Sequence, residues 1–393
     1  MKILCVNAGS SSLKFQLVEM PEEKMIISGY IEKIGLKDSF WTTKINGEKI
    51  RGEAYLKNHK DAAKVLIDEL LKHKAVESLD EIKGVGHRVL HGGEKYSDSV
   101  IITDEVIEDI KNLTKLGPLH HPGNLAGIEA MQKALPNVPM VAVYDTAFHQ
   151  TMPKVNYMYP VPMDWYTNFG VRKYGFHGTS HKYITLKMKD KLGKDEVNLI
   201  ICHIGSGASI SAIKDGKCFD TTMGISPLDG LMMGTRSGDV DLGAISFLIE
   251  KENLDSKGLS NLINKKSGLL GITGVSSDMR DVDNAAKEGN DRARLALDMY
   301  HYRIKKYVGA YAAAMGGIDV LVFTGGVGEN QISARKAICE GLEFMGIELD
   351  DAKNQVRGEN AIISKDNSKV KIVVIPTDEE LVIATDAMNI VSK

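Results

Sequence analysis

The sequence predicts an α/β protein made of two related domains. Its 393 residues exceed the roughly 250–300 residues at which a single hydrophobic core stops growing. Apolar runs typical of strands alternate with stretches that have helical spacing. The segment VNAGSS near the N-terminus recurs half a chain later as CHIGSG, which aligns Asn7 with His203. Self-similarity on this scale indicates a duplicated architecture.

The first half contains the elements of one such domain. Residues 2–6 form an apolar strand that ends in a Gly/Ser turn, and further strands are expected at 12–20 and 24–31. Residues 59–74 have apolar side chains at helical spacing. The elements expected to complete this half are a strand at 84–90, helices near 104–116 and 124–135, and a strand at 138–145.

The second half repeats this pattern after a change of texture near residue 150. The stretch 150–166 is rich in proline and aromatic residues and lacks a helical period, so we expect a domain junction there. The elements expected beyond it are strands at 197–203, 209–213 and 217–223, a helix at 292–315, a buried strand from 318 that runs into a glycine turn, and a helix from Asp378 onward that returns to the first domain. We predict one domain of residues 1–149 plus 379–393 and a second of residues 150–378.

Composition excludes several classes of protein. A formal net charge of -3 gives no basic footprint for a nucleic acid, so no nucleic-acid partner is expected. No apolar run is long enough to cross a bilayer, and the N-terminus lacks the apolar stretch of a signal peptide, so no membrane partner is expected. The four cysteines are scattered, as in a reduced protein, and a cytoplasmic location is expected.

The two glycine-rich turns carry the first chemical signal. Each is followed by more strand, whereas a Walker A loop or a Rossmann fingerprint leads into a helix. Backbone N–H groups in such turns can bind phosphate oxygens, because glycine lets a ligand approach closely. The alternative is a pair of tight hairpin turns that bind nothing.

An ordered set of longer strings resembles the acetate kinase family, within the acetate and sugar kinase/Hsp70/actin superfamily. The strings run from residue 7 to residue 381 and are NAGSSSLK, GHRVLHGG, PLHHPGN, YDTAFH, YGFHGTSH, HIGSGAS, MGTRSGDVD, SSDMRD, FTGGVGEN and PTDEEL. The resemblance implies two duplicated actin-like, ribonuclease H-like domains with a central nucleotide cleft, the second domain binding the nucleotide. It also implies reversible transfer of the ATP γ-phosphoryl group to acetate, giving acetyl phosphate and ADP, with Mg²⁺ or substituting Mn²⁺, in a homodimer.

The resemblance assigns a metal site to Asn7 and Glu379 and a nucleotide contact to Lys14. One amide and one carboxylate suffice for Mg²⁺, which keeps most of its waters and binds phosphate oxygens. Without the resemblance, Glu379 is equally explained as an acidic residue in an exposed first helical turn, and Lys14 as a solvated strand lysine.

Two arginines are the strongest candidates for catalysis. Joining a phosphoryl group to a carboxylate brings two anions together, and guanidinium forks match both. By resemblance Arg88 binds the carboxylate and Arg236, in a loop that looks flexible, stabilises the transition state. A structural ion pair is the alternative for each.

His177 and Asp145 complete the predicted catalytic set. By resemblance His177 donates to the transferring phosphoryl group. The rival interpretation is a zinc site with His181 at i,i+4 spacing, although Gly178 argues against a helix there. The family treats Asp145 as catalytic, but a short carboxylic acid is already ionised at neutral pH. We therefore expect Asp145 to orient Arg or His donors, or to position the nucleophile, rather than to act as a strong base.

The resemblance also assigns the nucleotide and acyl pockets. Residues expected to bind ATP, besides Lys14, are His203, Ile204, Gly205, Ser206, Gly207, Asp278, Met279, Arg280, Gly326, Val327, Gly328, Glu329 and Asn330. The small residues at 325–326 leave room for a nucleoside and favour ATP over pyrophosphate. The acyl pocket is expected to be Leu90, Leu119, Phe176 and Pro227.

Three positions depart from the family pattern. Leu90 stands where valine is expected, and its extra bulk favours acetate over longer acids. Ser206 replaces an asparagine, which puts that amide contact to the γ-phosphate in doubt. Asp378 replaces an asparagine and adds negative charge beside the predicted metal site.

The sequence alone leaves three rival functions open. A propionate or butyrate kinase of the same family is the nearest. A nucleotide-regulated clamp that transfers no phosphate would keep the ATP loops but would not need Arg88, His177 and Arg236. A zinc hydrolase is the third.

Overall fold

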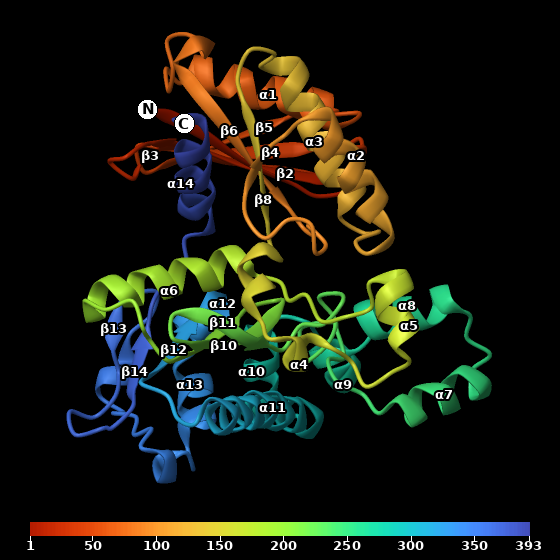
Figure 1. Ribbon diagram of the computed structural model, residues 1–393, viewed down its shortest axis with the longest axis vertical. Helices are drawn as coiled ribbons and strands as arrows, with labels where there is room; N and C mark the ends of the chain where they lie inside the picture. The colour runs from red at the N-terminus through yellow and green to blue at the C-terminus, as the bar shows by residue number, and fades with distance from the viewer. The chain divides into compact units, whose positions relative to one another are not determined.

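The computed structural model describes all 393 residues, which divide into two compact units. Unit 1 comprises Met1–Gln150 and Asp378–Lys393, and unit 2 comprises Thr151–Thr377. Each unit is built around one mixed β-sheet (Figure 1). No helix has both the length and the apolar character that crossing a membrane requires.

Unit 1 is organised around an eight-stranded sheet. Its strands are β1 (Lys2–Ala8), β2 (Ser12–Glu19), β3 (Lys24–Glu32), β4 (Phe40–Ile45), β5 (Glu48–Glu53), β6 (Ile82–Val89), β7 (Val100–Ile101) and β8 (Met140–Tyr144). In space the order is β5-β4-β3-β2-β1-β6-β8-β7. β1 is buried along nearly all of its length, as expected for a central strand covered on both faces.

Alternation along β1 divides its side chains between two cores. Leu4 and Val6 pack in the core under α1 (His59–Lys72), α2 (Asp104–Asn112) and α3 (His121–Ala134). Ile3 and Cys5 pack on the opposite face, in the core formed with the C-terminal helix α14 (Glu379–Val391). The C-terminal helix thus covers one face of the first sheet, as Figure 1 shows.

Unit 2 is organised around a six-stranded sheet. Its strands are β9 (Leu199–Ile204), β10 (Ala208–Lys214), β11 (Lys217–Thr221), β12 (Val320–Thr324), β13 (Ala361–Ile362) and β14 (Lys371–Val374), in the spatial order β11-β10-β9-β12-β14-β13. The long helices α6 (Gly178–Leu192) and α11 (Asp291–Met315) cover opposite faces of the sheet (Figure 1). The other helices are α4 (Lys154–Tyr157), α5 (Met163–Phe169), α7 (Leu242–Lys251), α8 (Ser256–Lys265), α9 (Gly268–Thr273), α10 (Met279–Lys287), α12 (Gly325–Asn330) and α13 (Ile332–Cys339).

The two sheets share one topology, which confirms the predicted duplication. The run β3-β2-β1-β6-β8 in unit 1 corresponds to β11-β10-β9-β12-β14 in unit 2. In each run the first three strands are antiparallel and the last two join in parallel. Both glycine-rich turns lead from the central strand straight into its antiparallel neighbour, as predicted. Asn7 pairs with Lys14 and His203 with Ser209, each one residue before the end of its strand.

Three local predictions were wrong, for related reasons. The glycine stretch after β12 is the short helix α12 rather than a turn. The junction at 150–166 contains the helices α4 and α5, whose N-caps are Pro153 and Pro162; proline is tolerated at a helix start, where its missing N–H would be unpaired anyway. Gly178 does not prevent a helix, as had been expected, but is the first residue of α6. Glycine is tolerated in the first turn of a helix better than in its interior.

A buried arginine ties α12 to the segment that follows α13. Arg335 is fully buried, and its guanidinium is satisfied by uncharged oxygens. Nη1 donates to the carbonyls of Gly328 at 2.9 Å and Glu329 at 3.0 Å. Nη2 donates to the carbonyls of Asn354 at 2.9 Å and Val356 at 2.8 Å, and Nε to the Asn354 side chain at 2.7 Å. Burial lowers the pKa of Arg335 to about 10, so the side chain remains cationic.

Arg335→Met is expected to destabilise the protein strongly, because four backbone carbonyls, two of them in buried hydrogen bonds, would lose their donor. We expect a loss of about 3 kcal/mol or more. Urea unfolding of the full chain, followed by circular dichroism, measures the change. The matched control is Lys336→Met, whose exposed ion pair with Asp351 contributes about 1 kcal/mol or less. Equal unfolding midpoints for the two variants would contradict this role for Arg335.

Candidate functional site

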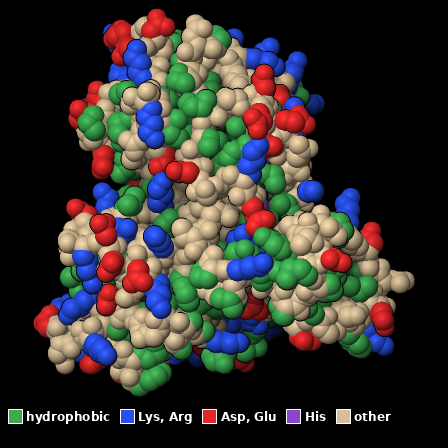
Figure 2. All heavy atoms as spheres, viewed as in Figure 1, with side chains coloured by type: hydrophobic (Ala, Val, Ile, Leu, Met, Phe, Trp, Pro, Cys, Tyr) green, Lys and Arg blue, Asp and Glu red, His purple; other side chains and the backbone are tan.

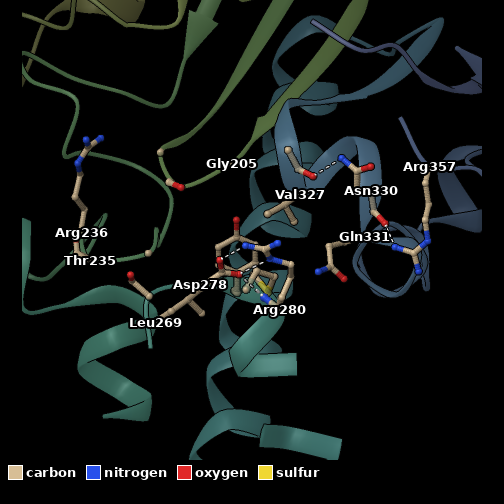
Figure 3. A pocket seen from close by; sticks show the side chains of 17 residues that line it. Gly205, Thr235, Arg236, Leu269, Asp278, Arg280, Val327, Asn330, Gln331 and Arg357 are labelled. Carbon is tan, nitrogen blue, oxygen red and sulfur yellow. Dashed lines mark hydrogen bonds and ion pairs between the residues drawn. The ribbon is translucent and has the colours of Figure 1, made fainter. Parts of the chain in front are cut away.

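Unit 2 contains a cavity of about 690 Å³ in which several predicted strings meet. This volume suits a small-molecule ligand. Figure 3 shows Arg236 and Thr235 on one side, Asn330, Gln331 and Arg357 on the other, and the paired side chains of Asp278 and Arg280 from the start of α10. The lining residues are Gly205, Ser206, Gly207, Gly234, Thr235, Arg236, Leu269, Ser277, Asp278, Met279, Arg280, Tyr300, Gly326, Val327, Asn330, Gln331 and Arg357.

Glycines shape the wall formed by α12. Gly325 has φ +77°, and a methyl group there would lie 2.9 Å from the backbone nitrogen of Ile204, so only glycine lets α12 pack against β9. Gly326 is different, since a methyl group placed on it would meet nothing within 4 Å. It opens onto the cavity, as the sequence suggested for both glycines.

Glu329 lies in this wall but does not line the cavity. Its carboxylate turns back and accepts hydrogen bonds from the backbone N–H of Gly325 at 2.8 Å and of Thr377 at 3.1 Å. It therefore holds the strand-to-helix turn in shape. The predicted residues His203, Ile204 and Gly328 also lie behind the lining rather than in it.

The segment that carries Arg236 is held firmly, although its sequence looks flexible. The backbone N–H of Met233 donates to the Arg236 carbonyl at 3.0 Å, and that of Gly234 to the Ser206 carbonyl at 3.3 Å. The guanidinium Nη1 donates to the Pro227 carbonyl at 2.9 Å. Burial lowers the pKa of Arg236, which has no carboxylate among its hydrogen-bond partners.

Two polar side chains converge on the second glycine turn. A methyl group placed on Gly207 would lie 3.4 Å from Nη1 of Arg236 and 3.4 Å from Nε2 of His177. Only a glycine leaves this space open to a ligand. The turn's backbone, a guanidinium and an imidazole thus surround one small volume, which suits phosphate oxygens.

His177 is positioned by the backbone and by two side chains. It is the N-cap of α6 and has φ 58°, a left-handed backbone conformation that is uncommon for a residue with a Cβ atom. Nδ1 lies 2.8 Å from the hydroxyl of Ser209, and the ring packs at 4.2 Å from that of His203. Nε2 of His181 lies 2.8 Å from the same Ser209 hydroxyl. The two imidazoles at i,i+4 spacing therefore share a hydroxyl, an arrangement that the zinc interpretation did not foresee.

In unit 1 the predicted carboxylate binder forms a bidentate ion pair. Nε of Arg88 donates to Oδ1 of Asp145 at 2.9 Å and Nη2 to Oδ2 at 2.5 Å. Nη1 also lies 3.3 Å from Oδ1 of Asn7. Asp145 directly follows β8 and is fully buried, whereas the Arg88 side chain keeps 22% of its surface exposed. The ion pair fixes the guanidinium of Arg88 against Asp145, and the predicted role of Asp145 in catalysis stays a prediction.

Electrostatics in this pair favour the charged forms at neutral pH. Burial raises the pKa of Asp145 to about 6, while the charge and hydrogen bonds of Arg88 act in the opposite direction. Burial would lower the pKa of Arg88, but the charge of Asp145, followed by that of Glu379, outweighs it and raises the pKa.

The predicted metal residues stand among further acidic groups of unit 1. Asp378 caps α14 by accepting from the Leu381 N–H at 3.0 Å, and burial raises its pKa. Lys14 forms an ion pair with Glu380. No group of three or more His, Cys, Asp or Glu side chains forms a closed metal site. An amide and a carboxylate oxygen, from Asn7 and Glu379, fit an ion that takes its remaining ligands from phosphate and water.

The first glycine turn is tied to neighbouring elements of unit 1 through its backbone carbonyls. His59 Nε2 lies 2.7 Å from the Gly9 carbonyl, and Asn124 Nδ2 donates to the Ala8 carbonyl at 2.8 Å. A methyl group on Gly123 would lie 2.5 Å from the Gly9 backbone, so α3 rests directly on this turn. Much of its hydrogen-bonding capacity is therefore used inside unit 1.

The predicted acyl residues differ in exposure. Leu90, just after β6, is buried, and its N–H donates to Oδ1 of Asn124 at 3.1 Å. Leu119 is 57% exposed. In unit 2, Phe176 is buried beside His177, and Pro227 gives its carbonyl to Arg236.

Sequence reasoning missed seven lining residues of the cavity. They are Gly234, Thr235, Leu269, Ser277, Tyr300, Gln331 and Arg357. Three of these belong to strings that had been recognised, MGTRSGDVD and SSDMRD, and could have been included. Tyr300 on α11 and Arg357 in a loop carry no local signal; Arg357 enters the wall by donating to the Asn330 carbonyl at 2.6 Å.

Known proteins resemble this chain over nearly its whole length. The acetokinase family model matches residues 2–385. An acetate kinase from Bacteroides thetaiotaomicron is 56% identical over 399 residues, covering all of both chains. The crystal structure of Porphyromonas gingivalis acetate kinase has a TM-score of 0.95 at 52% identity, with 99% of each chain covered. That of a propionate kinase from Francisella tularensis has a TM-score of 0.94 at 40% identity, also with 99% of each chain covered.

These matches and the duplicated sheet topology confirm the predicted fold class, two actin-like domains of the α/β class. Because both the family model and relatives above half identity extend over nearly the whole chain, the chain belongs to the acetokinase family.

Proposed function

We propose that the chain is an acetate kinase, which transfers the γ-phosphoryl group of ATP to acetate reversibly and gives acetyl phosphate and ADP. The observation that carries this proposal is the convergence of Arg236 Nη1 and His177 Nε2 on the glycine turn at Gly207. Donors of this kind are needed where negative charge develops on a transferring phosphoryl group. The relatives at 56% and 52% identity carry the same activity in their names.

In this proposal the cavity of unit 2 binds ATP. The turn at 205–207 takes the phosphates, and α12, Asp278 and Arg280 take the nucleoside. Gly326 supports a nucleotide rather than pyrophosphate, since its side of the cavity is open. Glu329 contributes through the backbone that it holds, and Ser206 can offer its hydroxyl in place of the expected amide.

The chemistry requires charge compensation more than proton transfer. An acetate oxygen attacks the γ-phosphorus in line, a new O–P bond forms, and the bond to the β–γ bridging oxygen breaks with its electron pair leaving on ADP. No base is needed, because a short carboxylic acid titrates near the Glu side chain, at about pH 4.3, and is ionised at neutral pH. Arg88, held by Asp145, binds the acetate carboxylate.

Asn7 and Glu379 would hold the Mg²⁺ that accompanies ATP, with Mn²⁺ as a substitute. When bound, the ion offsets phosphate charge. Lys14 forms an ion pair with Glu380 and so offsets the negative charge of the carboxylate next to Glu379.

Acetate is favoured over propionate or butyrate. Leu90 is buried and larger than the expected valine, so the acyl pocket has less room. One methylene changes the transition-state free energy by only about 1–3 kcal/mol, so some turnover of propionate is expected. The alternative is a longer acid as the substrate. The Francisella tularensis structure, which is 40% identical to this chain and named a propionate kinase, supports that alternative.

A hydroxylamine trap for acyl phosphate tests the proposal. The chain is incubated with ATP, Mg²⁺ and acetate, propionate or butyrate, and the hydroxamate is measured. We expect the highest kcat/KM for acetate. A higher value for propionate or butyrate would assign the chain to that substrate instead, and ATP binding without any hydroxamate would indicate a non-catalytic clamp.

In the same assay Arg88→Ala should lower kcat/KM for acetate by about a hundredfold or more, because one donor to the reacting anions is lost. Arg51→Ala is the control, since Arg51 pairs on the surface with Glu53. Equal activity of the two variants would remove Arg88 from the mechanism.

The pH dependence of kcat/KM for acetate should reveal the protonation of Asp145. Its folded pKa of about 6 lies above the ordinary value, so the carboxylate takes up a proton as the pH falls through 6 and Arg88 loses its charged partner. We expect kcat/KM for acetate to fall about tenfold per unit below that pH. Acetate itself is half protonated only at about pH 4.3, so its titration lies well below that of Asp145. Asp145→Asn should abolish the limb near pH 6; a wild-type profile that stays flat to pH 5 would contradict the assignment.

A homodimer is also proposed, from the apolar side chains that unit 2 exposes. Leu242 on α7 is 80% exposed and Phe247 58% exposed, and Phe169 on α5 is 63% exposed. Figure 2 shows apolar atoms gathered where Figure 1 draws α4 and α5. A second copy of the chain is the natural cover for such a surface. Sedimentation should give a dimer for the wild type and a monomer for Leu242→Asp combined with Phe247→Asp; a monomeric wild type would rule the dimer out.

The four cysteines support a cytoplasmic location. All are free and buried, as expected in a reducing compartment.

A further inference from the structure

Ser209 is a buried hydroxyl set between two imidazoles. It is the second residue of β10 and has no exposed surface. Its Oγ lies 2.8 Å from Nδ1 of His177 and 2.8 Å from Nε2 of His181. None of the recognised strings gives a role to this hydroxyl, and Ser209 does not line the cavity.

The hydroxyl has one proton and can donate to only one of the two imidazoles. With neutral rings, its proton is hydrogen-bonded within this group only if it donates to one imidazole and accepts from the other. In the first arrangement His181 donates from Nε2 to Ser209, and Ser209 donates to Nδ1 of His177. A neutral His177 then carries its proton on Nε2. In the second arrangement every donor and acceptor is reversed, and Nε2 of a neutral His177 has a lone pair instead.

The surroundings of His177 favour the first arrangement. Its Nε2 shares the space beside Gly207 with Nη1 of Arg236, where only hydrogen-bond donors suit phosphate oxygens. His177 also directly precedes the first turn of α6, and the positive end of the helix dipole disfavours an imidazolium there. A neutral ring that still donates from Nε2 meets both conditions.

We propose that Ser209 is a positioning residue that fixes His177 in the tautomer with its proton on Nε2. His177 then donates a hydrogen bond to the transferring phosphoryl group without becoming charged, and no proton changes owner in the reaction. The inference rests on the proposed kinase function for its catalytic consequence. The tautomer itself can be measured whether or not the chain has that function.

Other contacts hold the neighbouring groups independently of Ser209. His203, the cross-strand partner of Ser209, is held through Nδ1 by the hydroxyl of Ser180 at 2.8 Å. The His177 ring packs on that of His203, and the N–H of His181 donates to the His177 carbonyl at 3.0 Å. Removing the Ser209 hydroxyl should therefore leave the His177 tautomer no longer fixed, while the start of α6 keeps its structure.

The direct test combines nitrogen NMR with kinetics. In wild-type protein labelled with ¹⁵N-histidine, we expect His177 to show a protonated Nε2 and an unprotonated, hydrogen-bonded Nδ1. In Ser209→Ala the Nδ1 signal should lose the signature of its hydrogen bond. In the acetate assay kcat should fall about tenfold or more, with the KM values for acetate and ATP changed about threefold at most, because binding contacts are kept.

Ser211→Ala is the matched control. Ser211 lies two residues along β10, is equally buried, and bonds to the Thr221 hydroxyl at 3.0 Å rather than to a histidine. It should leave both the His177 signals and kcat unchanged. A wild-type His177 protonated on Nδ1, or a kcat in Ser209→Ala equal to that of Ser211→Ala, would overturn the proposal.

Failure of the proposed function would look different. It would appear as absent acyl phosphate in the wild type, while the wild-type NMR signals would still decide the tautomer. The same wild-type measurement decides the inference if Ser209→Ala does not fold.

Discussion

Repulsion between two anionic reactants is the constraint that explains why this chain holds its polar side chains as it does. A carboxylate and a triphosphate approach one another only where donors are already in place, because donors that must reorganise during the reaction contribute less. Each proposed donor is fixed by a second group. Asp145 holds Arg88, the Pro227 carbonyl holds Arg236, and Ser209 holds His177.

The duplicated fold supplies the places for these groups but uses them unequally. Both sheets turn from their central strand through glycine into an antiparallel neighbour. In unit 1 that turn is covered by α3 and tied by His59 and Asn124, while in unit 2 it borders the cavity. The two copies have therefore diverged: in unit 1 the central strand ends beside a guanidinium and a candidate metal site, and in unit 2 it ends at a turn that lines a cavity. The same topology thus supports different chemistry at equivalent strand ends.

Much of the fold could be predicted because its signals are local. Central strands read as continuous apolar runs, and the glycine turns have a distinctive composition, so the duplicated α/β architecture followed from the sequence. The ordered strings indicated the acetokinase family and most of the segments that line the cavity. The short helices at 154–157 and 163–169 were missed because proline was taken as a helix breaker where it begins a helix.

Other features depend on contacts that no local pattern encodes. Three contacts join residues from different segments: the Glu329 carboxylate accepts from the Thr377 N–H, Arg357 donates to the Asn330 carbonyl, and Arg335 is surrounded by backbone carbonyls. Ser209 meets His177 and His181 only because β10 passes under the start of α6. Such contacts are tertiary, and periodicity cannot reveal them.

The central claim is that Arg236 Nη1 and His177 Nε2 act as donors to the γ-phosphate of ATP beside Gly207. A crystal structure of the chain with a non-hydrolysable ATP analogue and Mg²⁺ measures this directly. The account predicts γ-phosphate oxygens within hydrogen-bond distance, about 3 Å, of both nitrogen atoms. A γ-phosphate bound elsewhere, with both side chains left in contact with solvent, would contradict it.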